Sequence, residues 1–406
     1  MAKGSTFAAL KHHNFRVLYP ANALSNIGTW AQRVAQDWLV LELTHSAAAL
    51  GIVTALQFAP SLVFSMAGGV LADRFDKRKL LFFTNAGSGI TSLLLGLLVM
   101  NHTVAIWHVY VLGLLLGLFN ALDAPIRQTF TSELVGANDV LGAISLNSLN
   151  FNVGRLIGPG VSGLMIAAFG TGPSFLLNAT SYLTMLFALG FIRKDELNIA
   201  EKPKDHVNIN AAFKYILGRK DLVIVLLIGF LGGTFGMNYQ IFNALMATQQ
   251  FHKGPAEFGG LGTFLAVGSV IGALLTSRLG RFRNPRFVTV AATVFGSALI
   301  ILSTAPNYLA YSLLLPIGGC AAVLTFVLAN TYVQTATEPH LRGKVVGVYM
   351  TLLMGGTPLG APLLGWLAEV LDIRWAMAIF GLTTALGSAG AYLIINRFAK
   401  GPREIG

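Results

Sequence analysis

The sequence is divided into apolar segments of about 20 residues or more, separated by short polar loops. A helix needs roughly 20 mainly apolar residues to cross the hydrocarbon core of a bilayer. Only 11% of the residues are charged, whereas a soluble domain has roughly 25%, so most of the surface must face something other than water. The pattern predicts an all-α membrane protein with twelve transmembrane helices, at residues 16–43, 48–72, 79–100, 104–126, 141–168, 172–192, 220–247, 256–279, 286–304, 307–333, 343–369 and 374–397.

The two halves of the chain repeat each other weakly at an offset of about 202 residues. Two halves of equal length, with the same residues at corresponding positions, are typical of a duplicated transporter fold. We therefore predict two pseudo-symmetric six-helix bundles, at residues 1–192 and 220–406, joined by a cytoplasmic linker at 193–219. The matching marks are Gly154, Gly158 and Gly163 with Gly356, Gly360 and Gly365, and, more loosely, Gly69, Leu71 and Arg78 with Gly272, Leu274 and Arg281.

The basic residues follow alternate loops. Of the 28 Lys and Arg residues, only Lys253 and Arg374 fall in loops on the opposite side, and Arg33 and Arg155 lie within segments. Such a bias predicts orientation, here a multi-pass protein of the bacterial inner membrane (plasma membrane) with both termini cytoplasmic. The net charge of +11 then faces anionic lipid headgroups, and the sequence does not require a nucleic acid partner.

The sequence offers little for covalent or metal chemistry. Cys320 is the single cysteine, and the eight histidines form no set with metal-ligand spacing. No glycine-rich run with the phosphate-binding pattern is present, and no histidine lies near the middle of a predicted segment. We therefore predict no metal, no cofactor and no enzymatic activity. A receptor would be expected to carry a soluble sensory domain, for which no loop is long enough.

Two motifs lie at and within predicted helices. The loop after the second segment reads Gly69-Val-Leu-Ala-Asp73-Arg74-Phe-Asp76-Lys-Arg78-Lys, and the fifth segment contains Gly154-Arg-Leu-Ile-Gly158-Pro159-Gly-Val-Ser-Gly163. The loop resembles the signature G-x-L-A-D-R-x-G-R-K of the major facilitator superfamily, except that Asp76 stands where the family usually has glycine. The second motif looks like the glycine–proline motif that the family's exporters carry in their fifth helix.

The resemblance implies the major facilitator fold and secondary transport by alternating access. It also implies a conformational latch formed by Gly69, Asp73, Arg74 and Arg78, in which the loop charges hold one conformation against neighbouring helix ends. The alternative is a basic loop that serves topology alone. The resemblance assigns Gly154, Gly158, Pro159 and Gly163 to helix packing.

Three further stretches resemble the branch that holds the bacterial enterobactin exporter and macrolide-efflux-type proteins. They are Asn14-Phe15-Arg16, Trp38-Leu-Val-Leu-Glu-Leu-Thr44 and Arg155-Leu-Ile-Gly158-Pro159. This resemblance implies export of a siderophore, an antibiotic or another amphipathic small molecule. An importer of a nutrient or metabolite remains an alternative, and a channel suits duplicated halves less well.

Polar side chains form a stripe on the first segment, where Asn26, Trp30, Arg33 and Asp37 recur at steps of three and four residues. In the superfamily, the first, fourth, seventh and tenth helices line an aqueous cavity. We therefore expect a substrate and proton pathway along these helices. Its candidate residues are Asn26, Trp30, Arg33, Asp37, Asn120, Asp123, Arg155, Asn238, Tyr239, Asn243 and Asn330.

The intramembrane charges allow two interpretations. A buried carboxylate, Asp37 or Asp123, could carry the coupling proton or balance a cationic substrate. Alternatively, Arg33 and Asp37 neutralise each other one turn apart, and Arg155 pairs with Asp37 or Asp123 to hold helices together. The arginine that many proton-coupled members carry in the fourth helix is missing from residues 113–117. The expected partners are a small-molecule substrate, protons and lipids, and the expected state is a monomer.

Overall fold

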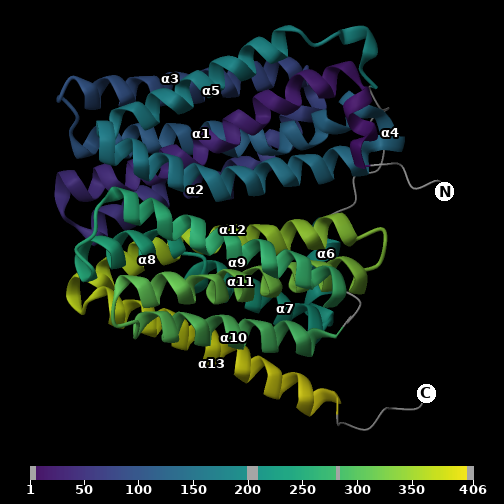
Figure 1. Cartoon of the computed structure of the whole chain (residues 1–406). Coiled ribbons are helices and arrows are strands. Elements are labelled where there is room, and N and C mark those ends of the chain that lie inside the picture. Colours follow the sequence, from purple (N-terminus) through teal and green to yellow (C-terminus); the bar gives the residue numbers. More distant parts are fainter. Residues whose placement is uncertain (1–5, 199–208, 280–283, 400–406) are drawn as a thin grey trace, which may run out of the picture. The chain divides into compact units, whose positions relative to one another are not determined.

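The computed structural model describes residues 6–198, 209–279 and 284–399 (Figure 1). These residues are almost entirely helical and contain no strand. The chain forms two compact units. The first comprises Met1–Lys204 with Lys253–Thr263, and the second comprises Asp205–His252 with Phe264–Gly406. The predicted division at residues 192 and 220 stays a prediction, because the short stretch Lys253–Thr263 packs with the first unit although it follows the linker.

The first unit is a bundle of long helices that run side by side, coloured purple to teal in Figure 1. One helix of 64 residues, α4, has a non-helical residue at Gly136 (φ 72°, ψ 174°). The break lies between the fourth and fifth predicted segments, which are both part of α4. The elements are η1 (Thr6–Lys11), α1 (His13–Thr44), α2 (Ala47–Arg74), α3 (Lys77–Met100), α4 (Ile106–Phe169), α5 (Gly172–Gly190) and η2 (Lys194–Glu196).

The second unit is also helical, and its first long stretch is interrupted twice by π-helix. The two π-helical pieces follow α7 and α8, so that residues 220–250 form one stretch of changing helical pitch. The elements are α6 (Ile209–Gly218), α7 (Lys220–Leu231), η3 (Gly232–Gly236), α8 (Tyr239–Leu245), η4 (Met246–Gln250), α9 (Pro255–Leu279), α10 (Pro285–Ser303), α11 (Tyr308–Ala336), α12 (Arg342–Val370) and α13 (Ile373–Ala399).

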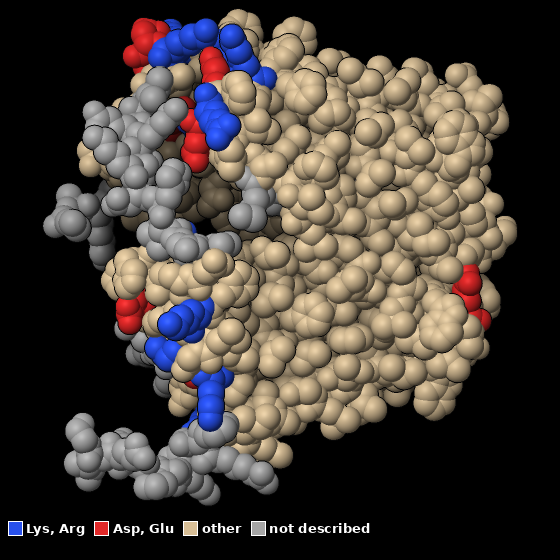
Figure 2. All heavy atoms as spheres, turned by 180° about the vertical axis from the view of Figure 1, so that it is seen from behind, with Lys and Arg blue, Asp and Glu red and all other residues tan. Residues whose placement is uncertain are grey.

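Nine helical stretches of the described chain are long and apolar enough to cross a membrane. The long α4 counts as one of them, although it contains two predicted segments. The helices α1 and α5 are not among the nine, because their polar residues make them less apolar on average. In Figure 2, the described side chains along the helix flanks are almost all uncharged, and the Lys and Arg side chains gather toward the helix ends. The exact number of twelve spans stays a prediction.

Close helix contacts in the first unit depend on glycine. A Cβ atom at Gly154 would lie 2.8 Å from the backbone of Asn26, and one at Gly158 would lie 2.6 Å from the Cβ of Trp30. The second part of α4 therefore approaches α1 at these two positions. A Cβ atom at Gly163 would lie 2.6 Å from the carbonyl oxygen of Pro255, at the start of α9. The absence of side chains lets three helix backbones meet.

The second unit repeats the first of these contacts. Cβ atoms at Gly356 and Gly360 of α12 would both overlap Thr234 in η3. In the predicted repeat, Gly356 and Gly360 correspond to Gly154 and Gly158. The first pair of glycines lets α4 pack against α1, and the second pair lets α12 pack against η3, which belongs to the stretch 220–250. In both units the contact is therefore made with the first long helical stretch. The other proposed match is incomplete, because Arg281 lies outside the described residues.

The start of α3 explains the departure of Asp76 from the superfamily signature. Asp76 is the N-cap residue of α3, and its Oδ1 accepts hydrogen bonds from the backbone N–H groups of Arg78 (2.9 Å) and Lys79 (3.3 Å). Two of the N–H groups that have no partner within the helix are thereby satisfied. The carboxylate also faces the positive end of the helix dipole.

Replacement of Asp76 by Ala is expected to lower the stability of the first unit by about 1 kcal/mol, because the cap is lost. Asp76→Asn keeps an acceptor and serves as the control, and Asp76→Gly should cost only a few tenths of that amount. Thermal unfolding of the purified protein measures the effect. An unchanged melting temperature in Asp76→Ala would show that the cap contributes nothing.

The predicted linker is partly helical. Asn198 donates its backbone N–H to the carbonyl oxygen of Glu133 (2.8 Å), just before the break in α4. Arg219, between α6 and α7, donates to the carboxylate of Asp221 from Nε (2.9 Å) and Nη2 (2.6 Å). These hydrogen bonds raise the pKa of the Arg219 guanidinium above its ordinary value. Residues 199–208 of the linker lie outside the described residues.

Candidate functional site

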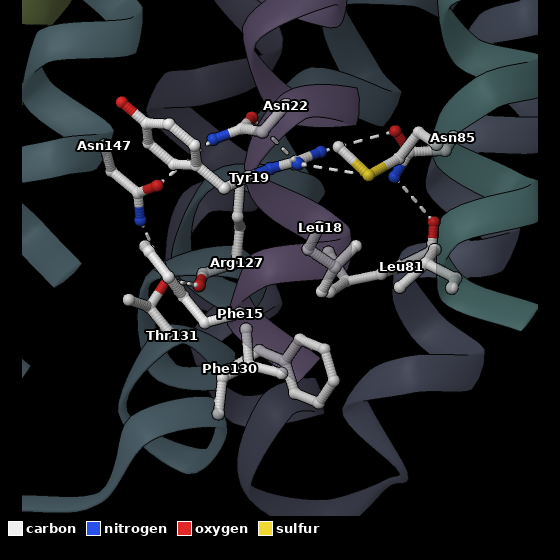
Figure 3. A pocket seen from close by; sticks show the side chains of 13 residues that line it. Phe15, Leu18, Tyr19, Asn22, Leu81, Asn85, Arg127, Phe130, Thr131 and Asn147 are labelled. Atoms are coloured by element: carbon white, nitrogen blue, oxygen red, sulfur yellow. Dashed lines mark hydrogen bonds between the residues drawn. The ribbon is translucent and has the colours of Figure 1, made fainter. Parts of the chain in front are cut away.

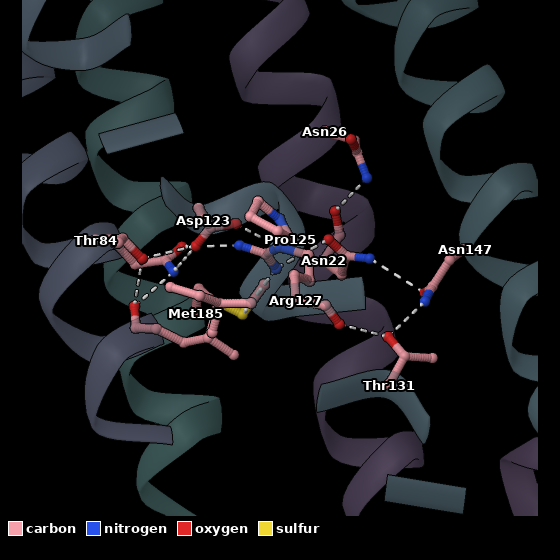
Figure 4. Close-up of polar contacts among 12 residues, drawn as sticks. Asn22, Asn26, Thr84, Asp123, Pro125, Arg127, Thr131, Asn147 and Met185 are labelled. Carbon is pink, nitrogen blue, oxygen red and sulfur yellow. Dashed lines mark hydrogen bonds and ion pairs between the residues drawn. The ribbon is translucent and has the colours of Figure 1, made fainter. Parts of the chain in front are cut away.

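Asp123 of α4 is the centre of a hydrogen-bonded network in the first unit (Figure 4). It is 9% exposed. Its Oδ1 accepts hydrogen bonds from the hydroxyl of Thr84 (2.7 Å) and from Nδ2 of Asn85 (2.9 Å), both on α3. Its Oδ2 forms an ion pair with Nε of Arg127 (2.7 Å), one turn further along α4. The carboxylate is thus surrounded by donors from two helices.

The guanidinium of Arg127 connects this carboxylate to other helices. Nη1 donates to Oδ1 of Asn22 on α1, and Nη2 donates to Oδ1 of Asn85, both at 3.3 Å. Asn22 donates in turn to Oδ1 of Asn147, in the second part of α4 (3.3 Å). These bonds are longer than typical N–H···O bonds of about 2.9 Å. Asp123 therefore holds the guanidinium more closely than the neutral amides do.

Sequence reasoning did not identify Arg127 as a site residue, because its charge was counted with the inner loops. The signal was available, since Asp123 and Arg127 are four residues apart in a segment with few other charges. The structure extends α4 through residue 135, so Arg127 lies about two turns before the break at Gly136. Asn22 extends the polar stripe of the first segment, whereas Thr84, Asn85 and Asn147 were not in the predicted pathway.

A cavity lies beside Arg127, between α1, α3, α4 and α5 (Figure 3). Its empty space is about 390 Å³, part of which is open solvent. One side of the lining is polar and the other is apolar. The lining residues are Phe15, Leu18, Tyr19, Asn22, Leu81, Asn85, Arg127, Phe130, Thr131, Leu134, Asn147, Met185 and Leu189.

Two arginines flank Trp30 on α1. The guanidinium carbon of Arg33 lies 4.8 Å from the centroid of the Trp30 ring and 5.1 Å from that of Phe58. Arg155 reaches the same indole from α4, at 5.9 Å. Cations at these distances are attracted by the face of an aromatic ring. Asp37, one turn beyond Arg33, is 3% exposed and interacts electrostatically with it. The structure therefore brings together four of the predicted residues.

The other predicted residues of the first unit have simpler surroundings. Asn26 donates to the backbone carbonyl of Asn22 (3.0 Å). Asn120 is half-buried on α4, three residues before Asp123. Both belong to helices that carry the network or the arginines.

The predicted residues of the second unit lie inside that unit. Asn238 is 2% exposed and donates to the carbonyl oxygen of Thr234 (2.8 Å), next to the π-helical turn. Tyr239 is 6% exposed and packs against aromatic rings. Oδ1 of Asn243 accepts a hydrogen bond from the hydroxyl of Tyr311 (3.0 Å). Asn330, on α11, is half-buried and accepts a hydrogen bond from Gln334 (3.2 Å).

The predicted latch residues have different surroundings. Asp73 and Arg74 end α2 with exposed side chains. Arg78 donates from Nε to the carbonyl oxygen of Leu189 (2.7 Å) and from Nη2 to that of Gly190 (2.8 Å), at the end of α5. Arg78 therefore caps carbonyl groups that a helix end leaves without partners. The latch stays a prediction.

Glycine at position 69 does not mediate a close contact, because a Cβ atom there would meet nothing within 4 Å. The neighbouring Gly68 does, since a Cβ atom there would lie 2.7 Å from the ring of Pro125. Among the described residues, no group of three or more His, Cys, Asp and Glu could hold a metal ion.

Comparison with known families gives a match over nearly the whole chain. The sequence profile described as "Transmembrane secretion effector" matches residues 4–400. The chain belongs to this family, within the major facilitator superfamily. Members of the superfamily are transporters, and this chain is therefore a multi-pass membrane transporter and not an enzyme.

Relatives with named functions match most of the length of this chain. The staphyloferrin A transporter of Staphylococcus aureus is 25% identical over 95% of this chain and 97% of its own. The enterobactin exporter EntS of Salmonella typhimurium is 26% identical over 89% of this chain and 87% of its own. The resemblance to the enterobactin-exporter branch is thereby confirmed.

Solved structures share the fold. A bacterial homologue of the human lysosomal transporter Spinster, in an inward-facing and unoccupied conformation, has a TM-score of 0.75 at 15% identity, over 97% of this chain and 98% of that chain. A D-xylose–proton symporter has a TM-score of 0.73 at 14% identity, over 93% of this chain and 97% of that chain. At these identities the likeness concerns the fold alone, and it confirms the all-α major facilitator architecture.

Proposed function

We propose that the protein is a secondary-active exporter of an amphipathic small molecule, of siderophore or drug type, driven by proton entry through alternating access. The observation that carries this proposal is the buried Asp123 with its single ion-pair partner Arg127. Ionisable residues at membrane depth are energetically costly, and those that are present usually serve a function. The names of the relatives, a staphyloferrin A transporter and an enterobactin exporter, support the direction and the substrate type.

The proposed coupling uses Arg127 as a movable counter-charge. Protonation of Asp123 would remove the attraction that holds the guanidinium by a 2.7 Å contact, and leave it with two weaker bonds to amide oxygens. The guanidinium could then turn toward the neighbouring cavity. A ligand or proton that acts on one of two conformations shifts the balance between them. Asp123 is thus proposed as the proton carrier.

The proposed substrate contacts lie on the face of α1 that carries Trp30, Arg33 and Asp37, together with Arg155 of α4. Aromatic rings and paired charges suit an amphipathic molecule with an ionised group. Asp37 balances part of the positive charge and is the second proposed proton-linked carboxylate. The pathway continues, in this proposal, through Asn26, Asn120, Asn238, Tyr239, Asn243 and Asn330.

Other predictions remain part of the proposal. Asp73 and Arg74, with Gly69 and Arg78, are proposed to stabilise one conformation as a latch. Gly154, Gly158, Pro159 and Gly163 are proposed to keep helix packing close during the transition. The proposed location is the bacterial inner membrane, with both termini cytoplasmic, as a monomer surrounded by lipid.

Efflux of ethidium from cells that express the protein tests this proposal. We expect efflux that collapses when a protonophore removes the proton gradient, and that falls strongly in Asp37→Asn, with expression checked in membranes. Asp195→Asn changes an exposed acidic residue outside the spans and serves as the control. Efflux that is unaffected by the protonophore would contradict proton coupling. Accumulation of ethidium driven by the gradient would favour the importer.

A further inference from the structure

The hydroxyl of Thr84 on α3 has two acceptors within hydrogen-bond distance. Its Oγ1 lies 2.7 Å from Oδ1 of Asp123 (Figure 4) and 3.2 Å from the carbonyl oxygen of Leu81, one turn earlier on the same helix. A hydroxyl group has one hydrogen to donate, and its oxygen can also accept hydrogen bonds. Thr84 is 2% exposed. The two acceptors therefore compete for one hydrogen inside the bundle.

Other threonines of the first unit show where such a hydrogen ordinarily goes. Thr91, Thr180 and Thr184 each donate to the carbonyl oxygen three residues earlier, at 2.8, 2.8 and 2.7 Å. At Thr84 the equivalent distance is longer, and the shorter contact is the one to Asp123. An O–H group that donates to a charged oxygen typically lies about 2.5–2.7 Å from it. The geometry is that of an ionised carboxylate with Thr84 as a donor.

The other groups bonded to this carboxylate can only donate. Nδ2 of Asn85 donates to Oδ1 of Asp123 (2.9 Å) and to the carbonyl oxygen of Leu81 (2.7 Å). Nε of Arg127 donates to Oδ2 (2.7 Å). Neither an amide NH₂ nor a guanidinium accepts hydrogen bonds. Within the described residues, Arg127 of α4 and Tyr182 of α5 are the titratable groups that interact with Asp123.

Uptake of a proton changes what the carboxyl group requires. The acid has an O–H group of its own, and a buried donor without an acceptor is costly. A proton on Oδ2 would point at the N–H group of Arg127, so that two donors would face each other. A proton on Oδ1 meets the oxygen of Thr84, provided that the Thr84 hydroxyl turns its hydrogen to the carbonyl oxygen of Leu81. That turn is a rotation about the Cβ–Oγ1 bond and breaks no covalent bond.

We propose that Thr84 is a positioning residue for Asp123, which donates to the carboxylate and accepts from the acid. The added proton forms one O–H bond at Oδ1, and the net charge of the pair with Arg127 rises from 0 to +1. The side chain of Asp123 keeps its place in both charge states, with Oδ2 turned toward the guanidinium. The inference rests on the proposed function only in that Asp123 takes up a proton.

Infrared spectroscopy of the full-length protein in lipid vesicles tests this inference. Acidification produces the carboxylic acid C=O band of Asp123, which is identified as the band that is missing in Asp123→Asn. The C=O band of an acid moves to higher wavenumber when the acid loses a hydrogen bond. We expect this shift in Thr84→Val, which keeps the shape of the side chain without its hydroxyl. Thr84→Ser restores the hydroxyl and should restore the wild-type wavenumber.

Thr91→Val is the matched control on the same helix. Thr91 lies two turns beyond Thr84, is 5% exposed and donates to the carbonyl oxygen of Ser88, so its replacement removes a similar hydroxyl that does not contact Asp123. The band should stay at the wild-type wavenumber. An unshifted band in Thr84→Val, or an equal shift in Thr91→Val, would overturn the inference. If Thr84→Val does not fold, Thr84→Cys should give a smaller shift in the same direction, because a thiol is a weak donor and acceptor.

Ethidium efflux separates this inference from the proposed function. Efflux that ignores the protonophore, together with a shifted band in Thr84→Val, would support the role of Thr84 and reject proton coupling. Efflux that collapses with the protonophore, together with an unshifted band, would reject the role of Thr84 alone. The absence of any Asp123 acid band over the pH range in which the protein stays folded would overturn the inference, and would leave Asp37 as the proposed proton carrier.

Discussion

Replacement of Asp123 by Asn is expected to abolish proton-driven efflux. The variant keeps the shape of the side chain but cannot exchange a proton, and loss of a positioned proton acceptor typically costs about two orders of magnitude or more in rate. It also leaves the guanidinium of Arg127 without its ion-pair partner. The pair is partly buried, so the loss of stability should be smaller than the about 3–5 kcal/mol that removal of one partner from a fully buried pair costs. Ethidium efflux and thermal unfolding measure the two effects separately.

The double variant Asp123→Asn with Arg127→Gln separates the charge balance from the proton chemistry. Because it removes both charges, it should regain most of the stability that the single variant loses. It should not regain proton-driven efflux, since no carboxylate is restored. Wild-type efflux in either variant would exclude Asp123 as the proton carrier. Equal melting temperatures of the single and double variants would show that the ion pair is not energetically coupled.

Replacement of Gly360 by Ala is expected to prevent normal packing of the second unit. A Cβ atom at this position would overlap the carbonyl oxygen of Thr234 in η3, and it would lie 3.1 Å from Nδ2 of Asn238. Backbone atoms cannot rotate away as a flexible side chain can. Overpacking of a well-packed core costs about 1–3 kcal/mol, and occasionally more. We expect a large loss of folded protein in membranes and a lower melting temperature.

Gly347 offers a matched control on the same helix, α12. A Cβ atom there would meet nothing within 4 Å, so Gly347→Ala should be neutral or should stabilise by about 0.5–1 kcal/mol through helix propensity. Detergent-solubilised samples of both variants can be compared by thermal unfolding. Equal stability of Gly360→Ala and Gly347→Ala would contradict the packing of α12 against η3.

Several features could be predicted because their signal is local in the sequence. Apolar segments identified the helices, and the loop after the second segment identified the superfamily, which the match over residues 4–400 confirms. The departure at Asp76 was also visible in the sequence. Its reason required the backbone, because only the start of α3 shows that the carboxylate accepts bonds from Arg78 and Lys79.

Other features could not be predicted from local patterns. The π-helical turns of η3 and η4 follow no composition rule in residues 220–250, and the helix α6 lies within a stretch that reads as a polar linker. Arg127 looked like a loop charge until the extension of α4 placed it in the bundle. Arg78 was grouped with the latch, although its guanidinium contacts carbonyl oxygens at the end of α5.

The sequence by itself determined that the chain is a helical membrane transporter of the major facilitator type. A backbone in lipid must have its polar groups satisfied by the protein itself, and an apolar segment of about 20 residues achieves this as a helix, so the apolar segments alone specify the class of structure. The tertiary structure alone decided which polar groups meet. Asp123 accepts hydrogen bonds from Thr84 and Asn85 on another helix, and Gln32 accepts one from Asn178, which is 146 residues away along the chain. These hydrogen bonds depend on how each helix is rotated about its axis. Close packing at glycines such as Gly28 and Gly158 sets that rotation.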